Sequence, residues 1–167
     1  MHITSLLENN LNDMCKFLIE ANKIKEYNIP SIQFSNGIKY YIGDKEYYGF
    51  SNDIKLYAFY NMYTNTIGMV VDEKPKYRLE YQDYSCDPII GSIVADFIPC
   101  LLATLSHEIA HWFRDNFTKP MSLEQNSHDY LWKPIYKKLR EQFVNNRNNI
   151  YKIGFQNEDL YNIIQHL

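Results

Sequence analysis

Cysteine, glycine and proline are all scarce in this 167-residue sequence, which contains three, six and six of them. The cysteines, Cys15, Cys86 and Cys100, are odd in number and include no C-x-x-C pair, which excludes a disulfide framework and a zinc ribbon and fits a reducing compartment. Cys15 and Cys100 fall on apolar stripes, so we expect them to be small core residues. Repeats, low-complexity tracts and signs of a domain boundary are also missing, and the length predicts one domain over residues 1–167.

A hydrophobic run long enough to cross a membrane is missing as well. The most apolar stretch, residues 89–105, is 17 residues long and contains Asp96, so it is short and carries a charge that is costly in a bilayer. Glu8 and Asp13 exclude a secretory signal at the N-terminus. We therefore expect no membrane partner and a cytoplasmic protein, or one in the host cytoplasm if the Asn-, Tyr-, Ile- and Lys-rich composition reflects a phage genome.

An excess of positive charge is also lacking. The net charge of −3 and the pI near 5.9 argue against a chain-wide electrostatic surface for nucleic acid, so nucleic acid is a partner that the charge does not support. The basic clusters within residues 74–78 and 133–140 are expected to be solvated surface. Hydrophobic residues make up 46% of the chain, which is enough to supply a core.

The order of hydrophobic patterns predicts an α+β fold. Recurrence at three- and four-residue intervals predicts helices over about 4–27, 90–116, 129–146 and 158–166. Residues 31–84 are rich in Tyr, Ile, Phe and Val and contain turn signals. They predict a small, mostly antiparallel sheet, because the connections are too short for helical crossovers. Alternating apolar residues on both sides of Asn36-Gly37 predict a hairpin there.

The most informative feature is His-Glu-Ile-Ala-His at residues 107–111, within the predicted helix 90–116. Positions four apart lie on one helix face, so His107 and His111 can present two imidazoles to a single metal ion. Glu108 is rotated by about 100° from His107 and can face a water at the open position of the metal. This is the arrangement of a zinc hydrolase with a carboxylate general base. The alternative is an ordinary helix that carries two hydrogen-bonded histidines.

A catalytic zinc takes a third protein ligand. His128 is the favoured candidate, since it lies 17 residues after His111, where the chain has turned back and a new helix begins. His2 and His166, at the two ends, are more typical of surface histidines. Competing oxygen ligands are the carboxylates of Asp115, Glu124, Asp129 and Glu141.

Two segments resemble a known family. Thr-Leu-Ser-His-Glu-Ile-Ala-His-Trp at 104–112, followed by Ser-His-Asp-Tyr-Leu-Trp at 127–132 and an apolar stripe over 135–139, looks like the SprT-like zinc metallopeptidases, which include the Spartan proteases. The resemblance implies a zincin-like order of N-terminal helix, small sheet, active-site helix with HExxH and third-ligand helix. It implies metal ligands at His107, His111 and His128, one Zn²⁺ per chain, and a general base at Glu108.

The chain departs from the family at two points. Ser127 and Asp129 stand where the family has glycines beside the third histidine. The C-terminal zinc ribbon of many members is expected to be missing, because the sequence has too few cysteines. Because the zinc ribbon is expected to be missing and the pI is acidic, the resemblance supports peptide-bond hydrolysis better than an action on DNA-crosslinked proteins.

These features predict a zinc metalloendopeptidase that hydrolyses a protein or peptide substrate through a metal-activated water, with Glu108 as general base. We expect an extended substrate to pair with an edge strand at about 66–72. Trp112 and Trp132 are expected to pack beneath the site, and Tyr130 to lie in the core or at the rim. Two alternatives stay open: a non-catalytic metal-binding domain that recognises a partner, and an ImmA/IrrE-like regulator protease, which would use a downstream acidic ligand.

Overall fold

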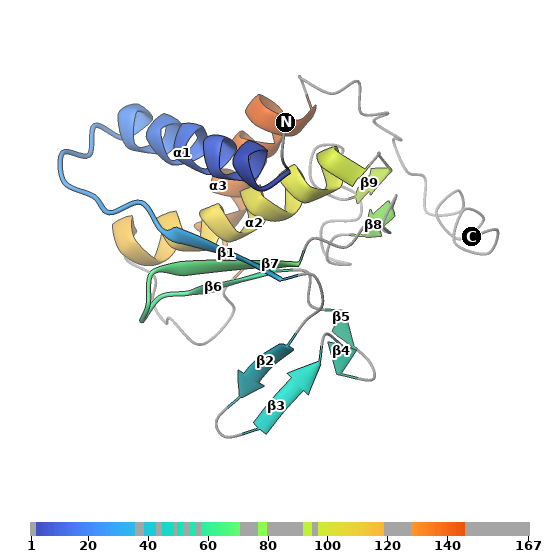
Figure 1. Cartoon of the computed structure of the whole chain (residues 1–167). Coiled ribbons are helices and arrows are strands. Elements are labelled where there is room, and N and C mark those ends of the chain that lie inside the picture. The colour runs from blue at the N-terminus through green and yellow to red at the C-terminus, as the bar shows by residue number, and fades with distance from the viewer. Residues whose placement is uncertain are drawn as a thin grey trace.

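The computed structural model describes residues 3–35, 39–42, 45–48, 50–51, 54–55, 58–70, 77–79, 92–94, 97–118 and 128–145. These residues form an α+β fold, which confirms the predicted class, with helices on one face of a small mixed sheet (Figure 1). The helices are α1 (Ile3–Ala21), α2 (Phe97–Phe117) and α3 (Trp132–Leu139), and α3 continues into a π-helix (Arg140–Asn145). The strands are β1 (Ser31–Ser35), β2 (Lys39–Ile42), β3 (Lys45–Tyr48), β4 (Phe50–Ser51), β5 (Ile54–Lys55), β6 (Ala58–Asn61), β7 (Thr66–Val70), β8 (Tyr77–Leu79) and β9 (Ser92–Val94).

The first helix ends earlier than the predicted residue 27. Lys23 adopts a positive φ of 54°, the left-handed conformation that stops a helix. Its N–H donates to the carbonyl of Glu20, and the N–H of Ile24 donates to the carbonyl of Ile19, which together make a Schellman motif. The sequence pattern does not reveal where α1 ends, because Ile24 continues the apolar spacing of the helix although it lies beyond the last helical residue.

The main sheet has the order β1-β7-β6 and is mixed, not mostly antiparallel. β1 pairs in parallel with β7, from Ser31 opposite Thr66 to Ser35 opposite Val70, and β6 pairs antiparallel with β7. The predicted hairpin across Asn36-Gly37 is wrong, since β1 pairs with β7 and β2 pairs with β3. The chain between β1 and β7 is long enough to return in the parallel direction, so the local turn signal does not decide the partner of β1.

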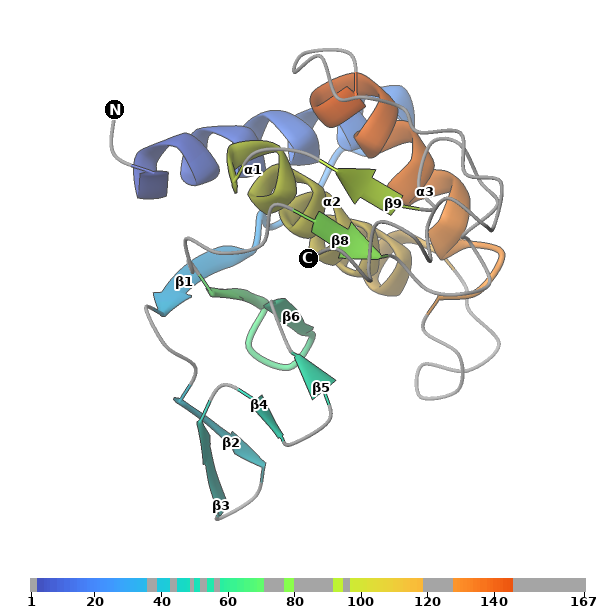
Figure 2. The same cartoon turned by 90° about the vertical axis from the view of Figure 1, so that its right-hand side faces the viewer.

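β7 is the central strand of this sheet, which overturns the expected edge strand at 66–72. The edges in the described part of the chain are β1 and β6. β2 and β3 form a separate antiparallel hairpin that projects away from the main sheet, as both cartoon views show (Figures 1 and 2). β4 pairs with β5 and β8 pairs with β9, again antiparallel.

The helix that carries the histidine pair begins at Phe97, later than the expected residue 90. Ile93 and Val94 belong to strand β9, in keeping with the preference of β-branched residues for extended backbone. Pro99 lies in the first turn of α2, where its missing N–H is not needed. A helix continued upstream would bring the Pro99 ring against the carbonyl of residue 95, which explains the late start.

The predicted helix over 129–146 is found in part. The α-helical backbone begins at Trp132 and changes to a π-helix at Arg140, which ends at Asn145. Pro134 lies in the first turn of α3, as its lack of an N–H requires. The helix predicted over 158–166 lies outside the described residues.

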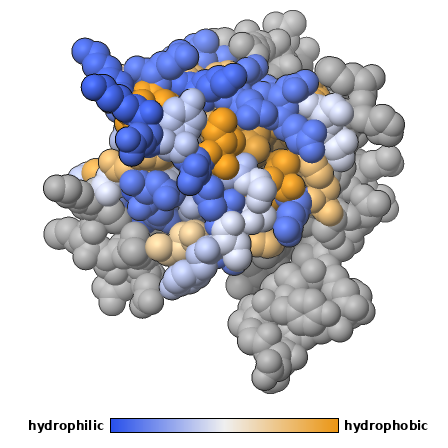
Figure 3. Space-filling model, turned by 60° about the vertical axis from the view of Figure 1, so that its left-hand side comes forward, coloured by the Kyte–Doolittle hydropathy of each residue, from blue (hydrophilic) through white to orange (hydrophobic). Residues whose placement is uncertain are grey.

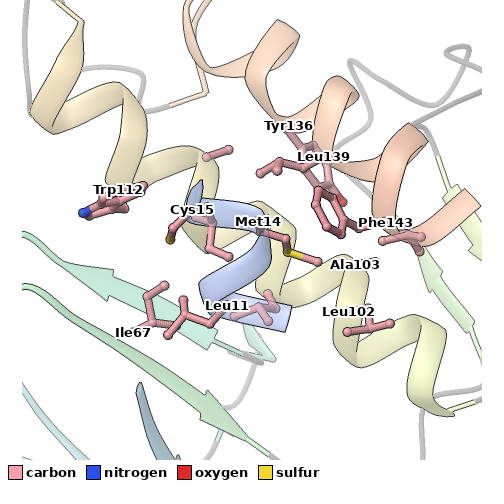
Figure 4. Packing of buried hydrophobic residues seen from close by; sticks show 14 of the residues in the cluster. Leu11, Met14, Cys15, Ile67, Leu102, Ala103, Trp112, Tyr136, Leu139 and Phe143 are labelled. Atoms are coloured by element: carbon pink, nitrogen blue, oxygen red, sulfur yellow. The ribbon is translucent and has the colours of Figure 1, made fainter. Parts of the chain in front are cut away.

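The core lies between the three helices and the sheet. α1 contributes a stripe at three- and four-residue spacing, and α2 and α3 face it (Figure 4). The buried side chains of α1 include Leu7, Leu11, Met14, Cys15 and Leu18, each at most 4% exposed. Ile67 and Met69 of the central strand close the core from the sheet side. Core positions predicted for Cys15 and Cys100 are confirmed.

Polar hydrogen bonds attach the sheet to α2. The amide Nδ2 of Asn116 donates to the hydroxyl of Tyr60 on β6 at 3.0 Å and to the carbonyl of Trp112 at 2.8 Å. The Tyr60 hydroxyl donates to Oδ1 of Asn65 in the turn between β6 and β7. These bonds fix the position of β6 relative to the C-terminal half of α2.

On the face shown in Figure 3, the coloured residues are mostly hydrophilic, with separate hydrophobic patches among them. Among the helices of the described residues, none combines the length and apolar character needed to cross a bilayer.

Candidate metal centre

The helix α2 holds the histidine pair in a buried position. Residues 100–110 are buried throughout, and His107 and Glu108 are only 3% and 6% exposed. The rings of His107 and His111 lie one turn apart with their centroids separated by 5.0 Å. Regular helical backbone from Phe97 to Phe117 therefore supplies the relationship that the spacing predicts.

The fold brings His128 to the same point from the start of the α3 segment. Its Nε2 atom lies 2.9 Å from Nε2 of His107 and 3.0 Å from Nε2 of His111. Each of the three side chains offers one ring nitrogen as a ligand atom, and these three atoms lie within 4.8 Å of one another, close enough to bind a metal ion. Two imidazole nitrogens on one tetrahedral zinc lie about 3.3–3.4 Å apart, given Zn–N bonds of roughly 2.0–2.1 Å. The observed spacing is slightly shorter and fits a small cation after a minor adjustment.

The donor set also suits a cation chemically. Burial lowers the pKa of His111 from 6.5 to about 2, and the neighbouring His107, His128 and Arg114 act in the same direction. A neutral imidazole has a lone pair for a metal, whereas an imidazolium has none. Three neighbouring nitrogens cannot all be satisfied by hydrogen bonds among themselves, but one cation accepts all three lone pairs.

Aromatic rings enclose the three imidazoles. The ring of Trp132 lies 4.6–5.4 Å from all three histidine rings, centroid to centroid, and is fully buried. Its indole N–H donates to the carbonyl of His107 at 3.3 Å. Tyr136, one turn further along α3, packs edge-on against the ring of His107 at 5.3 Å.

Trp132 thus packs beneath the three histidines, as the sequence predicts. Trp112, the other tryptophan, contacts Phe113 and Phe117 and belongs to the core under α2 (Figure 4). Tyr130 is 70% exposed, which overturns a core position for it and agrees with a position at the rim.

A buried arginine connects α2 with the segment that carries His128. Nε and Nη2 of Arg114 donate to the two carboxylate oxygens of Asp129 at 3.1 and 2.7 Å. Nη1 of the same guanidinium donates to Asp115 at 2.6 Å. Arg114 has no exposed side-chain surface, while Asp115 and Asp129 are 14% and 17% exposed.

The two carboxylates respond differently to this arrangement. Hydrogen bonds from Arg114 and from the backbone lower the pKa of Asp129. Burial raises the pKa of Asp115, and its bond to Arg114 only partly offsets that effect. Asp129 is therefore the better-matched partner of the guanidinium.

The competing oxygen ligands are not brought to the histidines among the described residues. Asp115 and Asp129 bind Arg114, and Glu141 is exposed on the π-helix. Glu124, His2 and His166 lie outside the described residues. Within the described ranges, the histidine trio is the one group of metal-ligating side chains with three members.

Sequence reasoning missed Arg114 and its bond to Asp129. The sequence carried a signal for this ion pair: Arg114 is a lone cation among the apolar Ile109, Trp112, Phe113 and Phe117, and a cation on a buried helix needs an acidic partner. The partner itself follows only from the fold.

Comparison of the chain with protein-family models, with curated proteins and with solved structures finds no match in any of the three.

Proposed function

We propose that this protein is a zinc-dependent metallopeptidase of the SprT-like, zincin type. The observation that carries the proposal is the convergence of three imidazole nitrogens beside a helical glutamate, with His107 and Glu108 adjacent and His128 arriving from another segment. His107, His111 and His128 would hold one Zn²⁺. A zinc ion bound in this way acts as a Lewis acid and lowers the pKa of water in its open position to about 7.

Glu108 supplies the proton transfers in this proposal. It follows the first ligand directly on α2, so it projects from an adjoining helix face, and its side chain is almost buried. A carboxylate shielded from bulk water can take a proton from the attacking water and return it to the leaving amine. A purely structural zinc would need a fourth protein ligand and would have no use for this carboxylate.

The substrate in this proposal is an extended peptide. Strand β6 is an edge strand in the described part of the chain, and Asn116 attaches it to α2 five residues after His111. A peptide that adds to this edge would gain backbone hydrogen bonds regardless of its sequence. The three cysteines of the sequence include no C-x-x-C pair, which supports a reducing compartment such as the cytoplasm for the reaction.

Metal analysis of the purified protein together with a peptide-cleavage assay tests the proposal. We expect about one zinc per wild-type chain, and cleavage products in a digest of denatured proteins analysed by mass spectrometry. Glu108→Gln should keep the zinc and lose cleavage by at least 100-fold, whereas Glu20→Gln on the exposed face of α1 should change neither.

Two outcomes contradict the proposal. If the wild-type protein binds zinc but cleaves no peptide, the protein is a non-catalytic metal-binding domain. If the His128→Ala variant still binds zinc with the affinity of the wild type, another side chain is the third ligand. This result would favour the ImmA/IrrE-like alternative, in which that ligand is acidic.

A further inference from the structure

We propose that Arg114 and Asp129 form a clamp that positions His128 against α2, so that the three-histidine site is already assembled before a metal binds. This inference rests on the proposed metal site and adds a positioning pair to it. Its first support is the geometry of the ion pair. Both carboxylate oxygens of Asp129 accept from different nitrogens of the Arg114 guanidinium, at 3.1 and 2.7 Å, which fixes orientation as well as distance.

Asp129 also organises the backbone that follows His128. Its Oδ1 accepts from the N–H groups of Leu131 and Trp132, at 3.0 and 3.1 Å, and its carbonyl accepts from the N–H of Lys133. These bonds satisfy amide groups at the start of α3 that have no partner within the helix. One carboxylate thus holds the start of α3 and the end of α2 together.

The α3 segment is attached to α2 at a second point. The Trp132 indole donates to the carbonyl of His107, and Arg114 lies seven residues, or two helical turns, further along α2. The two attachments are therefore about 10 Å apart along the helix axis. His128 precedes both anchored residues, and its ring reaches the site between the two attachments, against His107 and His111.

None of these bonds involves a metal. The clamp would reduce the conformational freedom that His128 loses when it binds zinc, and so increase the affinity of the site. Residues that orient a ligand in this way typically change metal affinity by 10- to 100-fold.

The chain provides a matched control for the test. Asp115→Asn and Asp129→Asn each remove one carboxylate from the same guanidinium, and each leaves the other of these two carboxylates in place. Of these two carboxylates, Asp129 is the one that connects Arg114 to the segment that carries His128, because Asp115 belongs to α2 itself. A difference between the two variants therefore measures the connection and not the loss of a charge.

We would measure zinc affinity by competition with a chromophoric chelator, and the absorption spectrum of the Co²⁺-loaded protein. Asp129→Asn should weaken zinc binding by 10- to 100-fold and alter the Co²⁺ spectrum, whereas Asp115→Asn should stay within about 3-fold of wild type. Arg114→Lys, which keeps the charge but loses the planar fork, should resemble Asp129→Asn. Equal affinities in the two Asn variants would overturn the clamp.

A metal-free measurement separates this inference from the proposed function. In the apo protein, nuclear Overhauser contacts between the His128 and His111 rings should be present in wild type and Asp115→Asn and absent in Asp129→Asn. Their persistence in Asp129→Asn would overturn the clamp even if zinc binds. A wild-type protein that binds no zinc but shows these contacts, and loses them in Asp129→Asn, would refute the proposed function and keep the clamp.

Discussion

The indole N–H of Trp132 donates a 3.3 Å hydrogen bond to the backbone carbonyl of His107, and the same indole packs against all three histidine rings. A residue on α3 thereby supports the backbone and the ring of His107 on α2. Replacement of Trp132 should affect the metal site as well as the core.

Trp132→Phe removes the indole N–H and part of the ring. We expect a loss of about 2 kcal/mol in the free energy of unfolding, from one hydrogen bond and incomplete packing, together with weaker zinc binding. Urea denaturation and zinc titration measure the two effects. Trp112→Phe is the control, since Trp112 is equally buried but contacts Phe113 and Phe117. An equal loss of zinc affinity in both variants would contradict a specific role for Trp132.

Zinc should stabilise the folded protein through the three histidines. At a free zinc concentration of 100 times Kd, the gain in the free energy of unfolding should be about 2.7 kcal/mol. The gain should disappear with a chelator and fall sharply in His128→Ala. Glu141→Ala, which removes an exposed carboxylate away from the three histidines, should keep the whole gain. Thermal denaturation with and without zinc gives the answer, and a loss in Glu141→Ala would point to the acid as the ligand.

The metal-free protein should lose stability in mild acid through His111. Its folded pKa of about 2 lies below the unfolded value of 6.5, mainly because of burial. The unfolded chain therefore takes up a proton as the pH falls below 6.5, while the folded chain does not, so acid favours unfolding. Between pH 7.5 and 5.5 this group should account for a loss of roughly 1 kcal/mol.

Urea denaturation of the apo protein at these two pH values tests the effect. In His111→Gln, which cannot titrate, the decrease in stability between the two pH values should be smaller by that amount. The same decrease in both proteins would show that the neutral state of this ring does not contribute to folding.

The thiols of Cys15 and Cys100 should resist modification while the protein is folded. Both are buried, and burial raises the pKa of the Cys15 thiol, so little of the reactive thiolate is present. Mass spectrometry after brief exposure to a maleimide should find neither residue labelled in native protein and both labelled in urea. Rapid labelling of Cys15 in the native protein would contradict its buried position on the core face of α1.

The sequence predicts well what depends on local spacing. His107, Glu108 and His111 take their relative positions from helical backbone alone, because each i to i−4 hydrogen bond fixes residues of the same turn. The apolar stripe of α1 and the placement of Cys15 and Cys100 in the core follow from the same periodicity. The boundaries were less accurate, since the stop at Lys23 and the late start after Pro99 depend on one backbone conformation and one ring.

The sequence by itself determined the α+β class and the pair of histidines with its neighbouring glutamate, all of which come from patterns a few residues long. Only the tertiary structure decided that β1 pairs in parallel with β7, and that Arg114 and Asp129 meet where His128 reaches the other two imidazoles. These relationships join segments 15 to 35 residues apart. The free energy of such contacts comes from packing and from burial of paired charges across the whole domain, which no short window of sequence contains.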